Sequence, residues 1–391
     1  MQPTPAVDRS ISFSVARQLE VYQRGSCVPV SCEALEARAR EALTPQAFAY
    51  LSGGAGAEDT MRANLEAFRR WRIEPRVLRD LSGRDWRTPL LGTVLPAPVL
   101  LAPIGMQGIF HADAELATAR AAASVRVPMI LSSAASRPLE QVADAMADAP
   151  RWFQFYWSAD AEVAASFLGR AERAGYSAIV VTVDCPILSW RERDLGLAYS
   201  PVVFGEGMAN YLSDPVFRSR LARPPEEDIE PAVRRFVETF GNAALTWNDL
   251  PFLRRHTRLP IVLKGILRAD DAARALDAGV DGLIVSNHGG RQVDGAVASL
   301  DALPRVAERV AGRVPVLLDS GIRRGADAFK ALALGASAVL LGRPYAWGLA
   351  AAGEQGVREV LLNFLADLDL TFGLSGCASV AEVTRDFLRR E

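Results

Sequence analysis

The chain has 391 residues, of which half are hydrophobic and 23% are charged, and its formal net charge is -2. This balance is typical of a globular protein with a large core, and the lack of a basic block argues against a nucleic-acid partner. No run approaches the roughly 20 apolar residues that span a bilayer, and no secretion signal begins the chain, so we expect a soluble, cytoplasmic protein without a membrane partner. The four cysteines lack the spacing of a zinc site or of a disulfide framework, so we expect a reduced compartment and no metal.

The first 97 residues are predicted to form a helical cap. Ser31 precedes a helix-period stretch that runs to Ala42, as an N-cap residue would. Thr44-Pro45 begins a second helix, which ends in Tyr50-Leu51-Ser52-Gly53-Gly54-Ala55-Gly56. We therefore divide the chain into this cap (1–97) and a larger domain (98–391).

Short apolar runs alternate with amphipathic helical stretches from residue 98 onward. Most of the runs begin some 20 to 35 residues apart, roughly the length of one βα unit. Continuous apolar strands separated by helices indicate a parallel sheet with both faces covered, and eight of them indicate a closed (β/α)8 TIM barrel. A doubly wound open sheet is the alternative. The predicted strands are Val99–Ala102, Met129–Leu131, Trp152–Tyr156, Ala178–Val183, Ile261–Leu263, Gly282–Val285, Val314–Leu318 and Ala338–Leu341.

One gap, between the fourth and fifth predicted strands, is much longer than the others. It predicts an insertion over about 192–250, and an insertion at that end of a barrel strand is commonly a lid or specificity loop. An inert surface excursion is the alternative. From Tyr345 to the C-terminus we expect further helices that close the barrel.

Polar groups occur where the predicted strands end, which is where barrel enzymes place their active sites. Glycines with Arg323 and Arg343 follow the seventh and eighth strands, a common phosphate site in barrels. Donors and acceptors at the other strand ends suit a polar heterocycle anchored by its phosphate. Flavin mononucleotide (FMN) fits better than a nicotinamide, because no G-x-G-x-x-G follows a first strand. The remaining polar groups are Ser132, Gln154, Thr182, Lys264, Ser286 and Asp319.

The cluster Ser286-Asn287-His288-Gly289-Gly290-Arg291-Gln292 follows the sixth predicted strand. His288 can take a proton near neutral pH, and Arg291 can hold a carboxylate in a bidentate grip. A base beside an anion clamp predicts proton abstraction next to a carboxylate. An ordinary loop histidine is the alternative, and the chain has only three histidines.

These motifs resemble the FMN-dependent L-2-hydroxy acid oxidising family, which includes glycolate oxidase, lactate oxidase and lactate 2-monooxygenase. The resemblance covers nearly the whole chain. It rests on Tyr50–Gly56, Ala102–Gly105, Phe153–Tyr156, Val181–Asp184, Leu263–Ile266, Ser286–Gln292, Asp319–Arg323 and Leu341–Pro344.

The resemblance implies a role for each site residue. His288 would be the active-site base, and Asp184 would stabilise its imidazolium. Arg291 and Arg191 would bind the substrate carboxylate, assisted by Tyr50 and Tyr156. Lys264 would lie beside the flavin where negative charge accumulates. The other cofactor-binding residues would be Pro103, Ile104, Gly105, Ser132, Gln154, Thr182, Ser286, Asp319, Gly321, Arg323, Gly342 and Arg343.

The subclass is predicted from three features: the long insertion, the run Tyr50–Glu58, and Thr246-Trp247-Asn248-Asp249-Leu250. They resemble lactate 2-monooxygenase most, which implies oxidation of L-lactate with O2 to acetate, CO2 and water. An oxidase that releases the 2-keto acid and hydrogen peroxide is the alternative, and an inactive flavin-binding interaction protein is an alternative of another class. Ala134 and Gly105 predict an open substrate pocket, and the family implies a homo-oligomer, often a tetramer.

Overall fold

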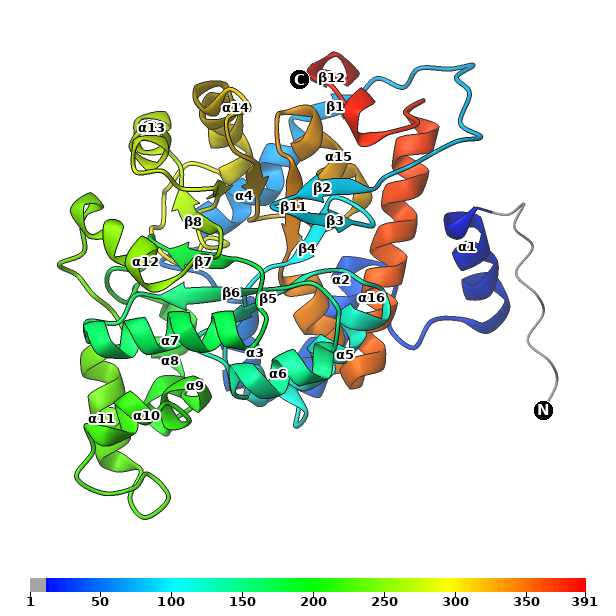
Figure 1. The fold of residues 1–391 in the computed structure, drawn as a ribbon. Coiled ribbons are helices and arrows are strands. Elements are labelled where there is room, and N and C mark those ends of the chain that lie inside the picture. The colour runs from blue at the N-terminus through cyan, green and yellow to red at the C-terminus, as the bar shows by residue number, and fades with distance from the viewer. Residues whose placement is uncertain (1–11) are drawn as a thin grey trace.

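The computed structural model describes residues 12–391, so residues 1–11 of the expected cap lie outside the described residues. Eight parallel strands close into a barrel in the order β10-β11-β4-β5-β6-β7-β8-β9, with β10 also paired to β9 (Figure 1). The predicted TIM barrel is therefore confirmed, and the open doubly wound sheet is wrong. The strands are β4 (Val99–Leu101), β5 (Met129–Ser132), β6 (Arg151–Tyr156), β7 (Ile179–Thr182), β8 (Ile261–Ile266), β9 (Gly282–Val285), β10 (Val316–Leu318) and β11 (Ala338–Leu341).

The barrel strands are apolar on both faces because both faces are buried. Alternate side chains point outward and pack against the surrounding helices, whereas the others fill the barrel interior. The outer ring consists of α5 (Ala114–Ser124), α6 (Leu139–Met146), α7 (Ala161–Arg173), α12 (Pro251–His256), α13 (Ala269–Asp277), α14 (Ser299–Val310) and α15 (Gly325–Ala333).

The segment before the barrel is not purely helical, because three short strands lie in it. The hairpin of β2 (Thr88–Leu90) and β3 (Thr93–Leu95) inserts Leu90 and Leu95 into the interior cluster and closes the end of the barrel where the strands begin. The preceding strand β1 (Trp71–Ile73) pairs with β12 (Leu388–Arg390), so the C-terminal end of the chain is fixed to the segment that precedes the barrel. Short, mixed-pattern segments of three residues carry too little periodicity to be predicted. The division at residue 97 stays a prediction.

Four helices precede these strands: α1 (Phe13–Arg24), α2 (Cys32–Ala42), α3 (Pro45–Ser52) and α4 (Asp59–Arg69). Ser31 caps α2 as predicted, because its side chain accepts a hydrogen bond from a backbone N–H group. The second helix begins at Thr44-Pro45 as predicted, and the side chain of Thr44 caps α3 in the same way. The C-terminal helix α16 (Arg343–Leu374) bends where Ala352 and Gly353 leave helical geometry, and it packs against α1, α2, α5 and α15. The turns η4 (Val380–Glu382) and η5 (Arg385–Phe387) follow it.

The predicted insertion lies between β7 and β8 and carries mostly short helices. These are α8 (Glu192–Gly196), η2 (Pro201–Phe204), α9 (Ala209–Leu212), α10 (Pro215–Ser219), α11 (Glu230–Thr239) and η3 (Trp247–Asp249). Tyr211, Phe217 and Phe236 of the insertion are fully buried, and Tyr211 packs edge-to-face on both phenylalanines and on Phe167 of α7, which joins the insertion to the main core.

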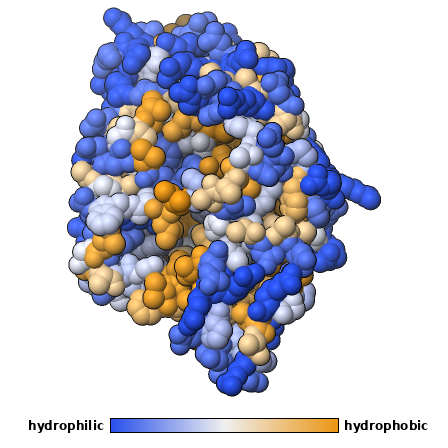
Figure 2. Space-filling model, turned by 90° about the vertical axis from the view of Figure 1, so that its left-hand side faces the viewer, coloured by the Kyte–Doolittle hydropathy of each residue, from blue (hydrophilic) through white to orange (hydrophobic). Residues whose placement is uncertain are grey.

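The surface in Figure 2 carries several separate apolar patches toward the middle, with hydrophilic residues around its margin. Ile187, Leu188 and Trp190, which follow β7, are among the exposed large apolar side chains of the molecule. No helix among residues 12–391 is long and apolar enough to cross a membrane.

Candidate active site

A layer of mostly polar side chains, which we call the polar ring, lies above the apolar interior of the barrel, toward the C-terminal ends of the strands. Each strand contributes one interior side chain to a buried layer that is hydrophobic throughout: Leu100, Ile130, Trp152, Val180, Val262, Ile284, Leu317 and Leu340. Two residues further along each strand, the side chain again points into the barrel, because side chains of a strand alternate between its two faces. Six of these eight positions carry a polar residue and two carry a small one: Ser132, Gln154, Thr182, Lys264, Ser286 and Asp319 are polar, and Ala102 and Gly342 are small.

Hydrogen bonds join this ring into two groups. Ser132 Oγ donates to Gln154 Oε1 at 2.9 Å, and Gln154 Nε2 donates to Thr182 Oγ1 at 2.9 Å. Lys264 Nζ donates to Ser286 Oγ at 3.0 Å and lies 3.3 Å from Asp319 Oδ2. Because each of these side chains is more than nine-tenths buried, the ring is a fixed polar floor.

A cavity opens above this floor at the C-terminal ends of the strands. Of the predicted site residues, Ser132, Gln154, Thr182, Asp184 and Ser286 are not among those that line this cavity. The predicted residues that line it are Tyr50, Pro103, Ile104, Gly105, Tyr156, Arg191, Lys264, His288, Arg291, Asp319, Gly321, Arg323, Gly342 and Arg343.

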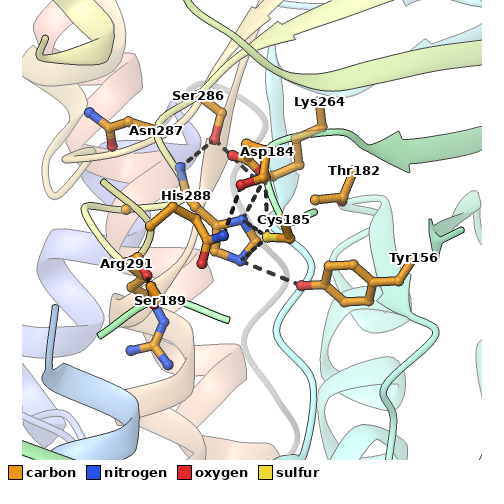
Figure 3. A network of polar contacts seen from close by, with 12 residues as sticks. Tyr156, Thr182, Asp184, Cys185, Ser189, Lys264, Ser286, Asn287, His288 and Arg291 are labelled. Atoms are coloured by element: carbon orange, nitrogen blue, oxygen red, sulfur yellow. Dashed lines mark hydrogen bonds and ion pairs between the residues drawn. The ribbon is translucent and has the colours of Figure 1, made fainter. Parts of the chain in front are cut away.

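His288 stands at the centre of the polar network in Figure 3. Its Nδ1 lies 3.0 Å from Asp184 Oδ1, and its Nε2 lies 3.4 Å from the hydroxyl of Tyr156. The residue has φ 59°, a left-handed conformation that costs a non-glycine residue about 1–2 kcal/mol. Gly289 and Gly290 follow with positive φ as well, so the turn folds sharply after β9 and presents the imidazole to the cavity.

Burial and charge determine the protonation of this pair. Burial lowers the pKa of His288 below its ordinary value, Asp184 opposes this shift, and the Lys264 charge adds to it. Burial alone would raise the pKa of Asp184, but His288 and Lys264 outweigh it and lower that pKa to about 2. The histidine is therefore neutral at pH 7 and free to accept a proton, while the aspartate is ionised.

Lys264 is a buried cation. Burial by itself would lower the pKa of its ammonium, but the carboxylates of Asp319 and Asp184 outweigh it and raise the pKa. The chain therefore holds a permanent positive charge at the cavity floor.

Two arginines flank the imidazole. Arg291 Nη1 donates to the carbonyls of Tyr50 and Gly53 at 2.7 and 2.8 Å, and its guanidinium stacks 5.0 Å from the centre of the Tyr50 ring. Arg191 Nε donates to Ser189 Oγ at 3.0 Å. Burial and the nearby Arg191 lower the pKa of Arg291 to about 10, which reflects two cations packed together and favours an anion between them.

A second pair of arginines, Arg323 and Arg343, lies where α15 and α16 begin, and Arg343 and Arg291 donate to the same carbonyl of Gly53. Arg343 donates to the carbonyls of Gly289 and Gly53, and Arg323 donates to that of Ile322. Among residues 12–391 neither guanidinium forms an ion pair, and the buried Nε of Arg343 has no hydrogen-bond partner. Burial lowers the pKa of both side chains. An unpaired cationic site of this kind fits a phosphate group.

Three positions that shape the site were not predicted. Asn64 of α4 exchanges side-chain hydrogen bonds with Asn287, and Ser320 Oγ accepts from the backbone N–H groups of Asn287 and Gly289. Cys185 lies 3.3 Å from His288 Nδ1. Asn64 has no signal in the sequence because its partner is 223 residues away. Cys185 directly follows Asp184, so inspection of that motif could have found it.

Ala134 does not open the cavity as predicted. It is 4% exposed, is absent from the lining, and its carbonyl accepts a hydrogen bond from Met106 N–H. A Cβ on Gly105 would approach that carbonyl to 2.6 Å. The glycine is therefore required by close backbone packing, and the expectation that Ala134 leaves a wall open is wrong.

Comparison with known proteins identifies the family. The family model described as FMN-dependent dehydrogenase matches residues 39–390. The chain belongs to this family. It is thus an FMN-dependent alpha-hydroxy acid oxidoreductase, and the alternative of an inactive interaction protein is set aside.

Relatives and solved structures of the FMN-dependent dehydrogenase family agree over nearly the full length. An L-lactate oxidase of Lysinibacillus sphaericus is 45% identical over 352 residues, 90% of each chain. An FMN-dependent alpha-hydroxy acid dehydrogenase of Penicillium citrinum is 44% identical over 382 residues, 95% of each chain. A crystal structure of mandelate oxidase with (S)-4-hydroxymandelic acid has a TM-score of 0.83 at 38% identity, covering 93% of this chain and 99% of that one.

These relatives are oxidases and a dehydrogenase. They do not support the predicted closeness to lactate 2-monooxygenase, and they favour the alternative of an oxidase. The insertion on which the prediction partly depended contributes little to the cavity. Among the described residues between β7 and β8, Arg191 lines it, and the segment 192–250 supplies no lining residue.

Proposed function

We propose that this chain is an L-2-hydroxy acid oxidase, which oxidises its substrate to the 2-keto acid and transfers the electrons to O2 to give hydrogen peroxide. The observation that carries the proposal is the neutral His288, fixed by Asp184 at 3.0 Å and facing a cavity that also holds Arg191 and Arg291. A base beside two carboxylate-binding cations matches a 2-hydroxy acid, in which the acidic group and the reacting carbon are neighbours.

Arg291 and Arg191 bind the substrate carboxylate in this proposal. Arg291 Nη1 is already occupied by two carbonyls, so Nη2 and Nε remain for the ligand. The carbonyls and the Tyr50 ring hold the guanidinium in place before substrate arrives, which lowers the entropic cost of binding. The hydroxyl of Tyr156 lies beside the imidazole of His288. Burial raises the pKa of this phenol, so the hydroxyl stays protonated and donates a hydrogen bond to a substrate oxygen.

His288 Nε2 removes a proton from the bound substrate. In the neutral imidazole Nδ1–H donates to Asp184 Oδ1, which fixes the tautomer with its lone pair on Nε2. Once the ring has taken the proton, the ionised Asp184 stabilises the positive charge.

The residues present fit FMN, the cofactor of the family. Arg323 and Arg343, with Gly321 and Gly342, would hold its phosphate, and the buried polar floor would hold its ring system. When bound, FMN supplies the ring that accepts two electrons from the substrate. Lys264 would place its fixed charge beside the ring and favour the build-up of negative charge there. The other residues proposed to contact the ring are Pro103, Ile104, Gly105, Ser132, Gln154, Thr182, Ser286 and Asp319.

The oxidase is preferred to a monooxygenase because the relatives that the chain resembles include an L-lactate oxidase and a mandelate oxidase. L-lactate is the first substrate to test. A homo-oligomer, expected as a tetramer, and a cytoplasmic location stay predictions.

The test is to supply L-lactate and O2 to the FMN-loaded protein and to quantify all products. An oxidase gives pyruvate and hydrogen peroxide in equal amounts. Acetate and CO2 without free peroxide would overturn the oxidase proposal in favour of the monooxygenase. If L-lactate gives no product, (S)-mandelate and longer 2-hydroxy acids are tried next, and inactivity with all of them would refute the proposal.

A further inference from the structure

Three side chains of different ligand types converge beside the imidazole, namely those of Asp184, Cys185 and His288. Cys185 Sγ lies 3.4 Å from Asp184 Oδ1 and 3.3 Å from His288 Nδ1, and the last two atoms are 3.0 Å apart. The three atoms thus form a nearly equilateral triangle, visible at the centre of Figure 3.

The triangle has the size of one face of a zinc coordination shell. Tetrahedral bonds of about 2.0–2.3 Å place neighbouring ligand atoms roughly 3.3–3.6 Å apart. The observed edges need to widen by only a few tenths of an ångström. A carboxylate, a thiolate and an imidazole are also the ligands that Zn²⁺ takes in proteins.

We propose that Asp184 Oδ1, Cys185 Sγ and His288 Nδ1 bind a thiophilic divalent cation such as Zn²⁺, and that the bound ion inhibits the enzyme. The sequence predicts no metal, and the proposed site is an inhibitory one rather than part of the reaction. Zn²⁺ binding can be measured without substrate, whereas the inhibition rests on the role proposed for His288.

The charge around the triangle permits a cation. Ionised Asp184 and a deprotonated Cys185 together balance a divalent ion, and the second carboxylate oxygen, Asp184 Oδ2, is buried without a hydrogen-bond partner. Lys264 and Arg191 are the opposing charges nearby, and Lys264 is itself paired with Asp319 at 3.3 Å. The thiol must lose its proton when the ion binds, so binding releases a proton.

Inhibition follows from the two nitrogens of the imidazole. A neutral imidazole carries one hydrogen. If Nδ1 binds the metal, that hydrogen must be on Nε2, and Nε2 can no longer accept a proton from substrate. The metal would therefore remove the base without filling the substrate cavity, so we expect the maximal rate to fall more than the apparent affinity for substrate.

Direct binding of Zn²⁺ to the FMN-loaded protein is the test, measured by equilibrium dialysis for wild type, Cys185→Ala and Cys185→Ser. Exposed Cys27 supplies the matched control, Cys27→Ser. We expect the wild type and Cys27→Ser to share one site that both Cys185 variants bind at least about tenfold more weakly. With Co²⁺ in place of Zn²⁺, a thiolate-to-metal absorption band should appear in the wild type and be missing from both Cys185 variants.

Equal Zn²⁺ affinity in the wild type and the Cys185 variants, or binding that disappears with Cys27, would overturn the site. The inhibition is scored separately, as the ratio of rates with and without Zn²⁺ for each variant. Zn²⁺ bound through Cys185 without any loss of rate would overturn the inhibitory role and also contradict the assignment of His288 as the base, while leaving the metal site intact.

Discussion

At the scale of single residues, the site consists of a neutral base and fixed cations. His288 is held between Asp184 and Tyr156, and Lys264 keeps its charge although it is only 3% exposed. Such arrangements stabilise charge that develops during a reaction at no cost of rearrangement.

The pH dependence of the rate should report on His288. Burial lowers its pKa below the ordinary value of 6.5, and only the neutral ring can accept a proton. We therefore expect kcat/KM to be constant through neutral pH and to fall in acid with an apparent pKa below 6.5. Asp184→Asn removes a charge that raises this pKa, so the apparent pKa should move lower still while the rate falls roughly 10²–10⁴-fold. An upward movement of the apparent pKa in Asp184→Asn would contradict this account.

Substitution of Arg291 tests the carboxylate grip. Arg291→Lys keeps the charge but loses the planar fork and its stacking on Tyr50. We expect kcat/KM to fall about 10- to 150-fold, because hydrogen bonds to charged groups are worth about 1.5–3 kcal/mol. The exposed Arg223→Lys is the matched control. Steady-state kinetics with unchanged constants in Arg291→Lys would remove this residue from the substrate site.

At the scale of elements, the site residues are positioned by the C-terminal ends of the strands and by the first residues of the helices that follow them. On the interior face, each strand carries a hydrophobic residue, and on six of the eight strands a polar residue follows two positions later. The turn after β9 presents His288, and Arg343 is the first residue of α16. The bend in α16 brings Gly348 and Gly356 so close that a Cβ on Gly356 would lie 2.0 Å from the Gly348 carbonyl oxygen.

This close approach predicts a stability effect at Gly356. Gly356→Ala forces the two halves of α16 apart, and we expect it to destabilise the protein by about 1–3 kcal/mol. Gly373→Ala in the same helix is the control, because its Cβ would meet nothing closer than 3.7 Å. Alanine there should be neutral or should stabilise by up to about 1 kcal/mol. Thermal or denaturant unfolding of both FMN-loaded variants measures the difference, and equal stability would contradict the packing described.

At the scale of the whole molecule, the barrel and most of the site could be predicted because they depend on local patterns. Eight apolar runs, spaced by about the length of a βα unit, specify the fold, and the polar residues at six of the strand ends follow from the strand register. Motifs such as Ser286–Gln292 then place the site. Contacts between distant segments could not be predicted. The Asn64–Asn287 pair, the β1–β12 pairing and the close packing of Gly105 on Ala134 depend on tertiary structure that no local pattern encodes.

The central claim is that the His288–Asp184 pair is the base for oxidation of a 2-hydroxy acid. The most direct measurement is anaerobic stopped-flow reduction of the bound FMN, with wild type and His288→Ala compared at equal FMN occupancy. We predict that L-lactate or a larger 2-hydroxy acid bleaches the flavin of the wild type, and that His288→Ala retains FMN but is bleached roughly 10²–10⁴-fold more slowly. Bleaching of His288→Ala at the wild-type rate would contradict the claim.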